Sequence, residues 1–178
     1  MLELALTHRS FSYEAGGIPT NERLEFLGDS VLGLIVTEEL YKKFPDLDES
    51  RLSPLRSGVV NMKALAQIAR QINLGSHLRI GKGEESTNGR DKNSILADSL
   101  EALVGAIYLQ HGYEKTAEII LNWMKPSLDS VLTLGAALDA KTALQELAAS
   151  LNLPSPEYEI SESGPDHDKS FIATALVG

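Results

Sequence analysis

The sequence has no cysteine among its 178 residues, and this absence excludes several kinds of site. A disulfide scaffold, a thiolate zinc site, an iron–sulfur cluster and a cysteine nucleophile all require cysteine side chains. The histidines are few and dispersed, at positions His8, His77, His111 and His167, so a histidine-based metal site is not favoured either. Any metal ion bound by this protein is expected to have mainly oxygen ligands.

Positive charge is also scarce, because 16 lysines and arginines face 25 aspartates and glutamates, for a net charge of −9 at pH 7. Nucleic-acid binders usually carry a basic patch, so the charge balance taken alone argues against such a partner. No apolar run approaches the ~20 residues of a membrane span, and the first residues lack a signal-peptide layout. With 43% hydrophobic residues, the chain is expected to fold around a core as a cytoplasmic protein.

Most of the chain has the apolar spacing of helices, interrupted by glycine and proline. Extended patterns occur only near 157–163 and 170–177, which predict two strands of a hairpin joined by the polar loop 164–169. The change from helical to strand period places a boundary near 134–138. The predicted helices span residues 22–44, 49–70, 93–111, 113–124 and 139–151, with a further short helical segment within 2–10.

This boundary predicts a larger helical domain, residues 1–133, and a smaller segment, residues 139–178, joined by a linker over residues 134–138. The smaller part is close to the size below which chains seldom fold alone. It also stops at Gly178, directly after an apolar strand, which would leave the hairpin with an open edge. The sequence therefore predicts that the chain is truncated at its C-terminus.

The predicted helix that begins at residue 22 carries three acidic residues on one side. With 3.6 residues per turn, Glu22, Glu25 and Asp29 fall within about 60° of one another. A solvated acidic stripe is the simpler interpretation of such a triplet. However, apolar residues lie beside the stripe as well as opposite it, and a helix that is apolar nearly all round is normally buried.

A second apolar helical segment contains only two charged residues, Asp98 and Glu101, which share one face because they are three positions apart. Buried carboxylates need compensation. The one basic residue close in sequence, Arg23, cannot neutralise these two together with Glu25 and Asp29, whereas a divalent cation can. An all-oxygen ligand set indicates a hard ion, Mg²⁺ or, as a substitute, Mn²⁺.

Paired carboxylates that bind such an ion are suited to hydrolysis of a phosphodiester. The ion would bind a phosphate oxygen and stabilise the leaving 3′-oxygen, and a neighbouring carboxylate would orient the attacking water or accept its proton. Serine nucleophiles are weakly supported, because no Gly-x-Ser-x-Gly segment is present. The stretch 81–84 lacks the ending of a P-loop and is interpreted as a surface loop, with Lys82, Arg90 and Lys92 as candidate contacts to a polyanion.

The segment 21–30 (NERLEFLGDS) resembles the signature of the bacterial ribonuclease III family. The similarity extends to residues 5–10 (ALTHRS), residues 52–56 (LSPLR) and the segment 95–109, and it covers nearly the whole chain. The resemblance implies an all-helical endonuclease domain that dimerises and cleaves double-stranded RNA with Mg²⁺, leaving 5′-phosphate and 3′-hydroxyl ends. It also implies a role in rRNA and mRNA processing and in RNA turnover.

The same resemblance assigns roles to four carboxylates, position by position. Glu25, Asp98 and Glu101 match the metal ligands of the family. Asp29 matches the active-site carboxylate that is paired with Glu101, so these two are the expected catalytic residues.

Three further positions are assigned by the resemblance or by the apolar helix that contains them. Glu22 and Glu49 match acidic positions that line the catalytic valley of the family, although exposed acids at helix ends are an equally good interpretation. Phe26 is the expected contact between the two copies of a homodimer.

The segment 139–178 is similar to the first half of a double-stranded RNA-binding domain. By that similarity, Gln145, Glu146 and His167 would reach ribose hydroxyls in the minor grooves of a duplex, whereas a surface helix and an ordinary turn are the alternatives. The chain also looks clipped at its N-terminus relative to the family. The expected fold is mainly α: an all-helical nuclease domain followed by a partial α+β double-stranded RNA-binding domain.

Two other functions compete with the duplex-RNA endonuclease. A helical nucleoside-triphosphate pyrophosphohydrolase also uses acidic helical pairs with Mg²⁺, but the 139–178 segment argues against it. An RNA-binding or maturation factor could keep the helical domain only as a dimerisation platform. Loss of a ligand carboxylate would have supported that second alternative, and none is lost.

Overall fold

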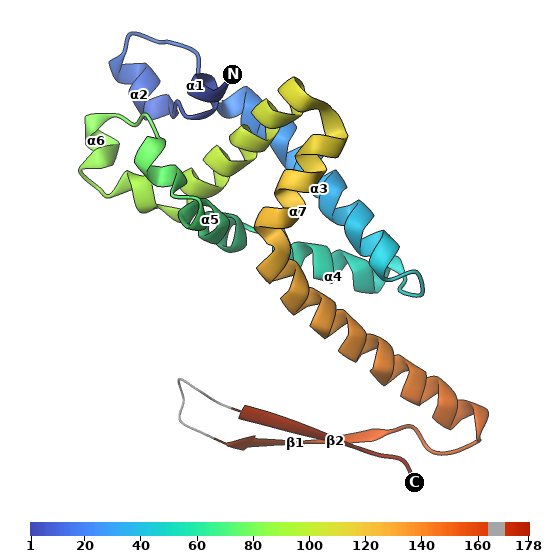
Figure 1. Ribbon diagram of the computed structural model, residues 1–178. Coiled ribbons are helices and arrows are strands. Elements are labelled where there is room, and N and C mark those ends of the chain that lie inside the picture. Colours follow the sequence, from blue (N-terminus) through green and yellow to red (C-terminus); the bar gives the residue numbers. More distant parts are fainter. Residues whose placement is uncertain (164–169) are drawn as a thin grey trace. The chain divides into compact units, whose positions relative to one another are not determined.

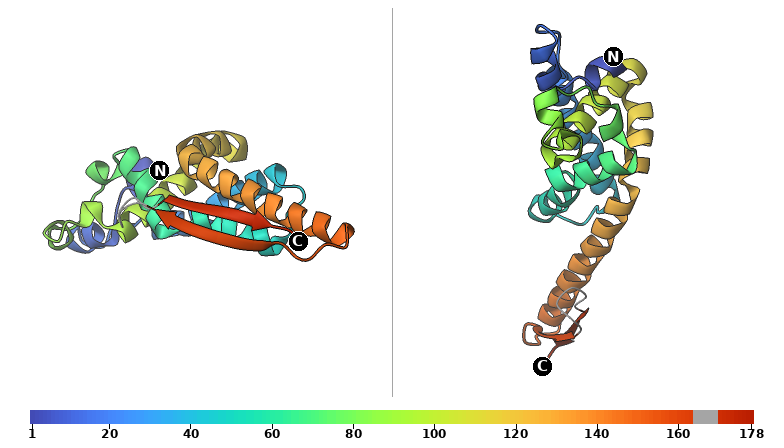
Figure 2. Two further views of the ribbon diagram at one scale, coloured as in Figure 1. Left: turned by 90° about the horizontal axis from the view of Figure 1, so that it is seen from below. Right: turned by 90° about the vertical axis from the view of Figure 1, so that its left-hand side faces the viewer.

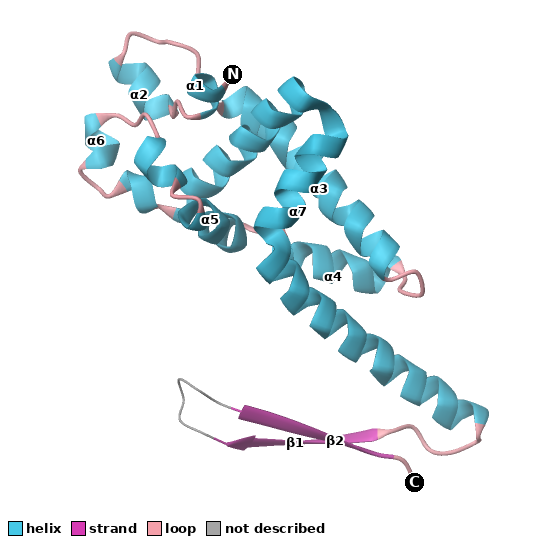
Figure 3. Ribbon diagram, in the orientation of Figure 1, coloured by secondary structure: helices cyan, strands magenta, loops and turns pink. Residues whose placement is uncertain are grey.

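The computed structural model describes residues 1–163 and 170–178, and these residues are mainly helical (Figure 1). The chain divides into two compact units, Met1–Leu132 and Thr133–Gly178. Figure 3 shows helices throughout the first unit, whereas the named strands of the described chain form one hairpin in the second. The mainly α fold predicted from the sequence is confirmed.

The first unit is a set of helices around an apolar core. In chain order its elements are α1 (Leu2–Ala5), α2 (Arg9–Glu14), α3 (Glu22–Lys43), α4 (Glu49–Val59), α5 (Met62–Gln71), η1 (Leu74–His77), α6 (Lys82–Glu85), η2 (Gly89–Asp91) and α7 (Asn93–Ser150), which begins in this unit. Side chains from α3, α4, α5 and α7 fill the core, and its most deeply buried members include Leu32, Ile35, Val36, Val59, Leu65, Leu96, Val104, Ile120 and Met124. Each such side chain stabilises the fold by about 1.5–3 kcal/mol.

Helix α3 is buried along one face and open along another. Leu24, Val31 and Leu32 are at most 7% exposed, whereas Phe26 is 79% exposed and Leu34 is 57% exposed. The expectation that this helix is buried all round is therefore wrong within a single copy of the chain. Its apolar residues outnumber the positions that can face one core, so some of them remain at the surface.

Two predicted helical segments are each divided in the structure. The predicted helix 49–70 is two helices, α4 and α5, because Asn61 accepts a hydrogen bond from the backbone N–H of Ala64 (3.0 Å) and donates to the carbonyl oxygen of Ser57 (3.0 Å). This cap satisfies backbone groups at the end of one helix and at the start of the next. Residues 2–10 are divided between α1 and α2, since Thr7 forms a parallel bridge with Arg79.

Helix α7, in contrast, is longer than the sequence predicts. It turns back on itself at Gly112, whose φ of 75° suits glycine (Figure 1), so the predicted break between 111 and 113 is present. Beyond it the helix continues to Ser150 through Pro126 and through residues 134–138, instead of ending at 124 and restarting at 139. A single proline or glycine weakens a helix without always ending it. Within the described residues, no helix combines the length and apolar character needed to cross a membrane.

The second unit holds the C-terminal part of α7 and the hairpin. Strands β1 (Glu157–Ser163) and β2 (Ser170–Leu176) pair antiparallel, with Glu157 opposite Leu176, and they lie side by side in the left view of Figure 2. The Lys141 ammonium lies 4.7 Å from the ring centroid of Tyr158 and thus joins α7 to β1. The two strands lie where the sequence predicts them, and the predicted loop 164–169 falls outside the described residues.

Candidate active site

Helices α3 and α7 cross in direct backbone contact, and this crossing positions the site. A Cβ atom on Gly28 of α3 would lie 1.7 Å from the carbonyl oxygen of Glu101 on α7. A Cβ atom on Gly105 of α7 would lie 2.3 Å from the carbonyl oxygen of Leu24 on α3. Both distances are shorter than the 3.0 Å below which real Cβ contacts essentially do not occur. Only glycine allows the two helices to approach this closely.

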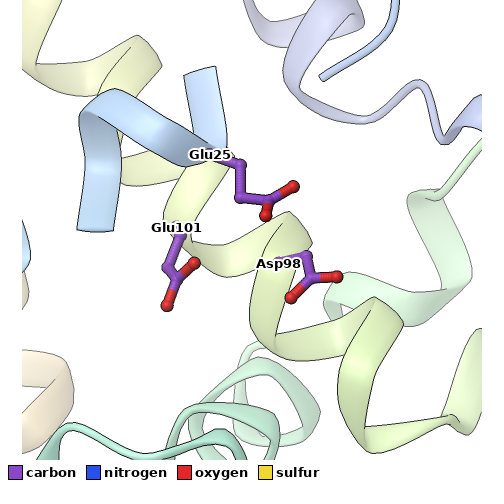
Figure 4. A group of neighbouring side chains, drawn as sticks. All are labelled: Glu25, Asp98 and Glu101. Carbon is purple, nitrogen blue, oxygen red and sulfur yellow. The ribbon is translucent and has the colours of Figure 1, made fainter. Parts of the chain in front are cut away.

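Three carboxylates converge beside this crossing, one from α3 and two from α7 (Figure 4). Ligand oxygens of Glu25, Asp98 and Glu101 all lie within 4.8 Å of one another, and each side chain is half-buried. Asp98 and Glu101 share a face because one helical turn separates them. Glu25 joins them only because the glycine contact brings the two helices together.

The surroundings of these carboxyl groups favour their protonated forms. Burial, together with the negative charges of Asp29, Asp98 and Glu25, raises the pKa of Glu101 to about 7. Burial is also the largest cause of the raised pKa of Glu25, to which the charge of Asp98 adds, and of the raised pKa of Asp98. Ionising all three groups at neutral pH is therefore unfavourable unless positive charge is brought close to them.

The donor set of this cluster fits a hard divalent cation. Within the part of the chain that the structure describes, no lysine or arginine forms an ion pair with Glu25, Asp98 or Glu101. Half-buried carboxylates without such a partner can be compensated by a bound ion, and their oxygens are the ligands that Mg²⁺ and Mn²⁺ prefer. Among the described residues, this group consists of carboxylates alone.

The other predicted acidic residues lie at different distances from this cluster. Asp29 is exposed on α3, one turn after Glu25, and its charge contributes to the raised pKa of Glu101. Glu22 is exposed at the start of α3, accepts a hydrogen bond from the Thr20 hydroxyl (2.8 Å) and raises the pKa of Glu25. Both acids therefore act electrostatically on the cluster.

Glu49 lies apart from these acids. It begins α4 and lines a different pocket, of about 430 Å³, together with Thr37 and Arg56. The fold of a single chain does not place Glu49 in the group of three carboxylates.

The residues predicted to bind RNA or a second copy lie on the surface. Gln145 and Glu146 are exposed on α7 within the second unit, and Phe26 is exposed on α3. His167 lies outside the described residues.

A cleft of about 790 Å³ adjoins the carboxylates and contains residues to which the sequence reasoning gave no role. Glu22, Glu25 and Asp98 line it, and so do His8 and Arg9 from the start of α2. Both residues lie inside the ALTHRS segment, which is a signal of their involvement. The wide spacing of the histidines, however, argues against a role for His8 in a metal site. Burial is the largest cause of the lowered pKa of His8, which favours a neutral ring.

The raised pKa of Glu101 predicts how the stability of the metal-free protein depends on pH. A carboxyl group whose pKa rises from 4.5 to about 7 on folding binds its proton more tightly in the native state. The free energy of unfolding should therefore increase as pH falls from about 8.5 to about 5, by roughly 1–2 kcal/mol after allowance for partial exposure. Urea denaturation in EDTA measures it. Glu101→Gln should remove most of this pH dependence, and an unchanged dependence in that variant would contradict the assignment.

Comparisons with known proteins agree on one kind of relative. The family model described as Ribonuclease-III-like matches residues 1–128. The chain is 57% identical over 177 residues to Ribonuclease 3 of Thermobifida fusca, covering 99% of this chain and 74% of that protein. It is 56% identical over 178 residues to Ribonuclease 3 of Streptomyces coelicolor, covering 100% of this chain and 64% of that protein.

A solved structure gives the same kind of relative. The nuclease domain of ribonuclease III from Campylobacter jejuni matches with a TM-score of 0.67 and 44% identity, covering 72% of this chain and 87% of that one. The description of that structure concerns flexibility in a region involved in dimer formation.

Proposed function

Since this chain belongs to the bacterial ribonuclease III family and is an endoribonuclease, we propose that it hydrolyses double-stranded RNA with Mg²⁺, leaving 5′-phosphate and 3′-hydroxyl ends. The observation that carries this proposal is the convergence of Glu25, Asp98 and Glu101 within 4.8 Å, half-buried and without an ion pair to lysine or arginine among the described residues. These carboxylates repel a polyanionic substrate, so such a substrate can approach only after a cation has offset the negative charge of the site.

The proposed roles follow from the positions of the side chains. Glu25, Asp98 and Glu101 would hold Mg²⁺, with Mn²⁺ as a possible substitute. Bound there, the ion would supply Lewis-acid stabilisation of the charge that develops on the phosphate. Asp29 is exposed beside the cluster, so its carboxylate can orient the attacking water or accept its proton. Glu22 lines the adjoining cleft. We propose that Glu49 also lines the catalytic valley, in a dimer whose second copy completes that valley.

We propose a separate function for each of the segments that the sequence delimits. Residues 1–133 form the catalytic domain, residues 134–138 connect it, and residues 139–178 contribute to binding the duplex. The exposure of Gln145 and Glu146 supports contacts with ribose hydroxyls, and His167 belongs to the same proposed surface. We place the activity in the cytoplasm, in rRNA and mRNA processing and in RNA turnover.

One assay tests the proposed reaction directly. Duplex RNA of about 20 base pairs and its separated strands are incubated with the protein in Mg²⁺, in Mn²⁺ and in EDTA. We expect cleavage of the duplex alone, only with a divalent ion, and products that a ligase can join because they carry 5′-phosphate and 3′-hydroxyl ends. Equal cleavage of single strands, cleavage in EDTA, or turnover of free nucleoside triphosphates without duplex cleavage would contradict the proposal.

The exposed ring of Phe26 predicts a homodimer. Phe26 is 79% exposed on a helix that also exposes Leu34, and exposed apolar side chains of this kind are typical of an interface that a second copy covers. The wild type should sediment as a dimer at micromolar concentration, and Phe26→Asp should be monomeric because a charge would be buried at the contact. Met62→Asp is the matched control, since Met62 is 55% exposed on α5, and it should remain dimeric. A monomeric wild type would contradict the dimer.

A further inference from the structure

The cleft beside the carboxylates has a wall to which the proposed chemistry gives no role. His8, Arg9 and Ser10 contribute this wall, and Glu25 and Asp98 line the same cleft. A volume of about 790 Å³ is within the range of cavities that hold ligands of nucleotide size. The proposed metal ligands and this wall therefore face a common binding space.

The hydrogen bonds of His8 determine which ring nitrogen is available to a ligand. The backbone N–H of Ser10 donates to Nδ1 of His8 (3.2 Å), so Nδ1 carries no proton. Ser10 Oγ lies 2.8 Å from the same Nδ1 and accepts from the backbone N–H of Gly81 (2.8 Å). With Nδ1 unprotonated, the Ser10 hydroxyl is the donor in its contact with His8. The neutral ring must then carry its proton on Nε2, which is left as a hydrogen-bond donor.

This wall is held firmly in place by the rest of the first unit. The backbone N–H of His8 donates to the carbonyl oxygen of Arg79 (3.0 Å), and the N–H of Arg79 donates to the carbonyl oxygen of Leu6 (2.8 Å). The His8 side chain also caps α2 through its contact with Ser10. A donor fixed in this way loses little conformational freedom when it binds a ligand.

Arg9 supplies a positive charge on the same wall. It is exposed, and within residues 1–163 and 170–178 its guanidinium forms no ion pair. Lys92, the other basic residue of the cleft, is instead paired with Glu84. Arg9 lines the same cleft as Glu25 and Asp98, so its charge can serve a ligand bound there.

We propose that His8 and Arg9 form a phosphate-binding subsite, which holds a backbone phosphate of the RNA strand adjacent to the phosphate that is cleaved. The Nε2–H group of His8 donates to one non-bridging oxygen, and the planar guanidinium of Arg9 binds the others. Glu14, Glu22 and Glu84 also line the cleft and repel a phosphate from their side of it. The subsite rests on the proposed function, and its residues position the strand without taking part in bond cleavage.

Two substitutions separate this role from a structural one. His8→Asn keeps an oxygen that can accept from the Ser10 backbone N–H, and asparagine is a favourable N-cap, but it has no donor at the place of Nε2. Arg9→Ala removes the free guanidinium without breaking an observed ion pair. Lys63→Ala is the control, because it removes one positive charge from an exposed position on α5, outside the cleft.

Binding is measured by fluorescence anisotropy with labelled duplex RNA in Mg²⁺, in a Glu101→Gln background that is expected not to cleave. Arg9→Ala should raise the Kd about five- to tenfold and lower the slope of log Kd against log salt by about 1. His8→Asn should raise the Kd about three- to fivefold at unchanged Tm, and Lys63→Ala should stay within about twofold. In the wild-type background, the first two substitutions should raise KM more than they lower kcat.

The state of the His8 ring is tested separately by ¹⁵N NMR of the imidazole. We expect an unprotonated Nδ1 and a protonated Nε2 in the wild type, and loss of this preference in Ser10→Ala. An Nδ1–H ring, or an unchanged Kd and salt slope in both His8→Asn and Arg9→Ala, would overturn the subsite. If the wild type still cleaves duplex RNA in that case, the proposed function stands alone. If the wild type neither cleaves nor binds duplex RNA, the proposed function fails and the subsite fails with it.

Discussion

Glu101→Gln should reduce cleavage of duplex RNA in Mg²⁺ by on the order of a thousandfold or more while the protein stays folded. Glu101 is the most strongly perturbed of the three clustered carboxyl groups, with a pKa raised to about 7. Its carboxylate is both a proposed metal ligand and the neighbour of Asp29. Glutamine has nearly the same shape, but it brings no negative charge to the ion and cannot accept a proton.

The same substitution should have a distinct effect on stability. In EDTA above about pH 7, the neutral amide removes the repulsion among Glu25, Asp98 and Glu101, so the free energy of unfolding should rise slightly. Reduced activity together with retained or increased stability separates a chemical role from a structural one.

Initial rates with duplex RNA and urea denaturation are the two measurements. Glu114→Gln is the matched control, because Glu114 is an exposed acid on the same helix outside the cluster, and it should cleave at the wild-type rate. A Glu101→Gln protein with wild-type activity in Mg²⁺ would refute the proposed metal centre.

Gly28→Ala should destabilise the protein by about 3 kcal/mol or more and thereby abolish activity. The new methyl group would lie 1.7 Å from the carbonyl oxygen of Glu101 and 2.9 Å from the backbone nitrogen of Gly105. These are backbone atoms, which cannot rotate away as the end of a flexible side chain can. The helices α3 and α7 must separate, so Glu25 leaves Asp98 and Glu101.

A second glycine on the same helix is the control for Gly28. A Cβ atom on Gly33 would meet no atom within 4 Å. Gly33→Ala should therefore keep or raise the stability, by up to about 1 kcal/mol, because alanine favours a helix over the unfolded chain. Thermal unfolding and cleavage assays compare the two variants. Equal stability of Gly28→Ala and Gly33→Ala would show that the close crossing does not hold the site together.

The acidic composition has a different meaning once the site is known. Four of the 25 acidic residues, Glu25, Asp29, Asp98 and Glu101, are at or beside one cluster. Their charge initially argued against an RNA partner. In the proposed enzyme these carboxylates bind a cation, and the cation attracts the RNA phosphate that the carboxylates alone would repel.

The sequence by itself determined the features that depend on neighbouring residues. The apolar period indicated the helices, the alternating pattern indicated both strands, and the three-residue spacing placed Asp98 and Glu101 on one face. Such features follow from the pitch of a helix or the pleat of a strand, which are the same in every protein. The signature around Glu25 also revealed the family, because a long motif agrees by chance only rarely.

Local capping was less visible in the sequence, although a signal for it existed. Asn61 precedes the second of two helices that the apolar spacing joined into one, and asparagine is a favoured N-cap. The spacing continued across the break because apolar residues on both sides face the same core. At Pro126 the sequence errs in the opposite direction: a proline predicts the end of a helix, but α7 continues through this residue.

Only the tertiary structure decided which distant residues meet. The contact of Gly28 with the backbone of α7 brings Glu25 to Asp98 and Glu101, while Glu49 stays at another pocket of the same chain. The tertiary structure also places His8 in the cleft and leaves Phe26 exposed. Periodicity describes the faces of one helix, whereas the meeting of two helices depends on where their backbones can approach, and here two glycines make that approach possible.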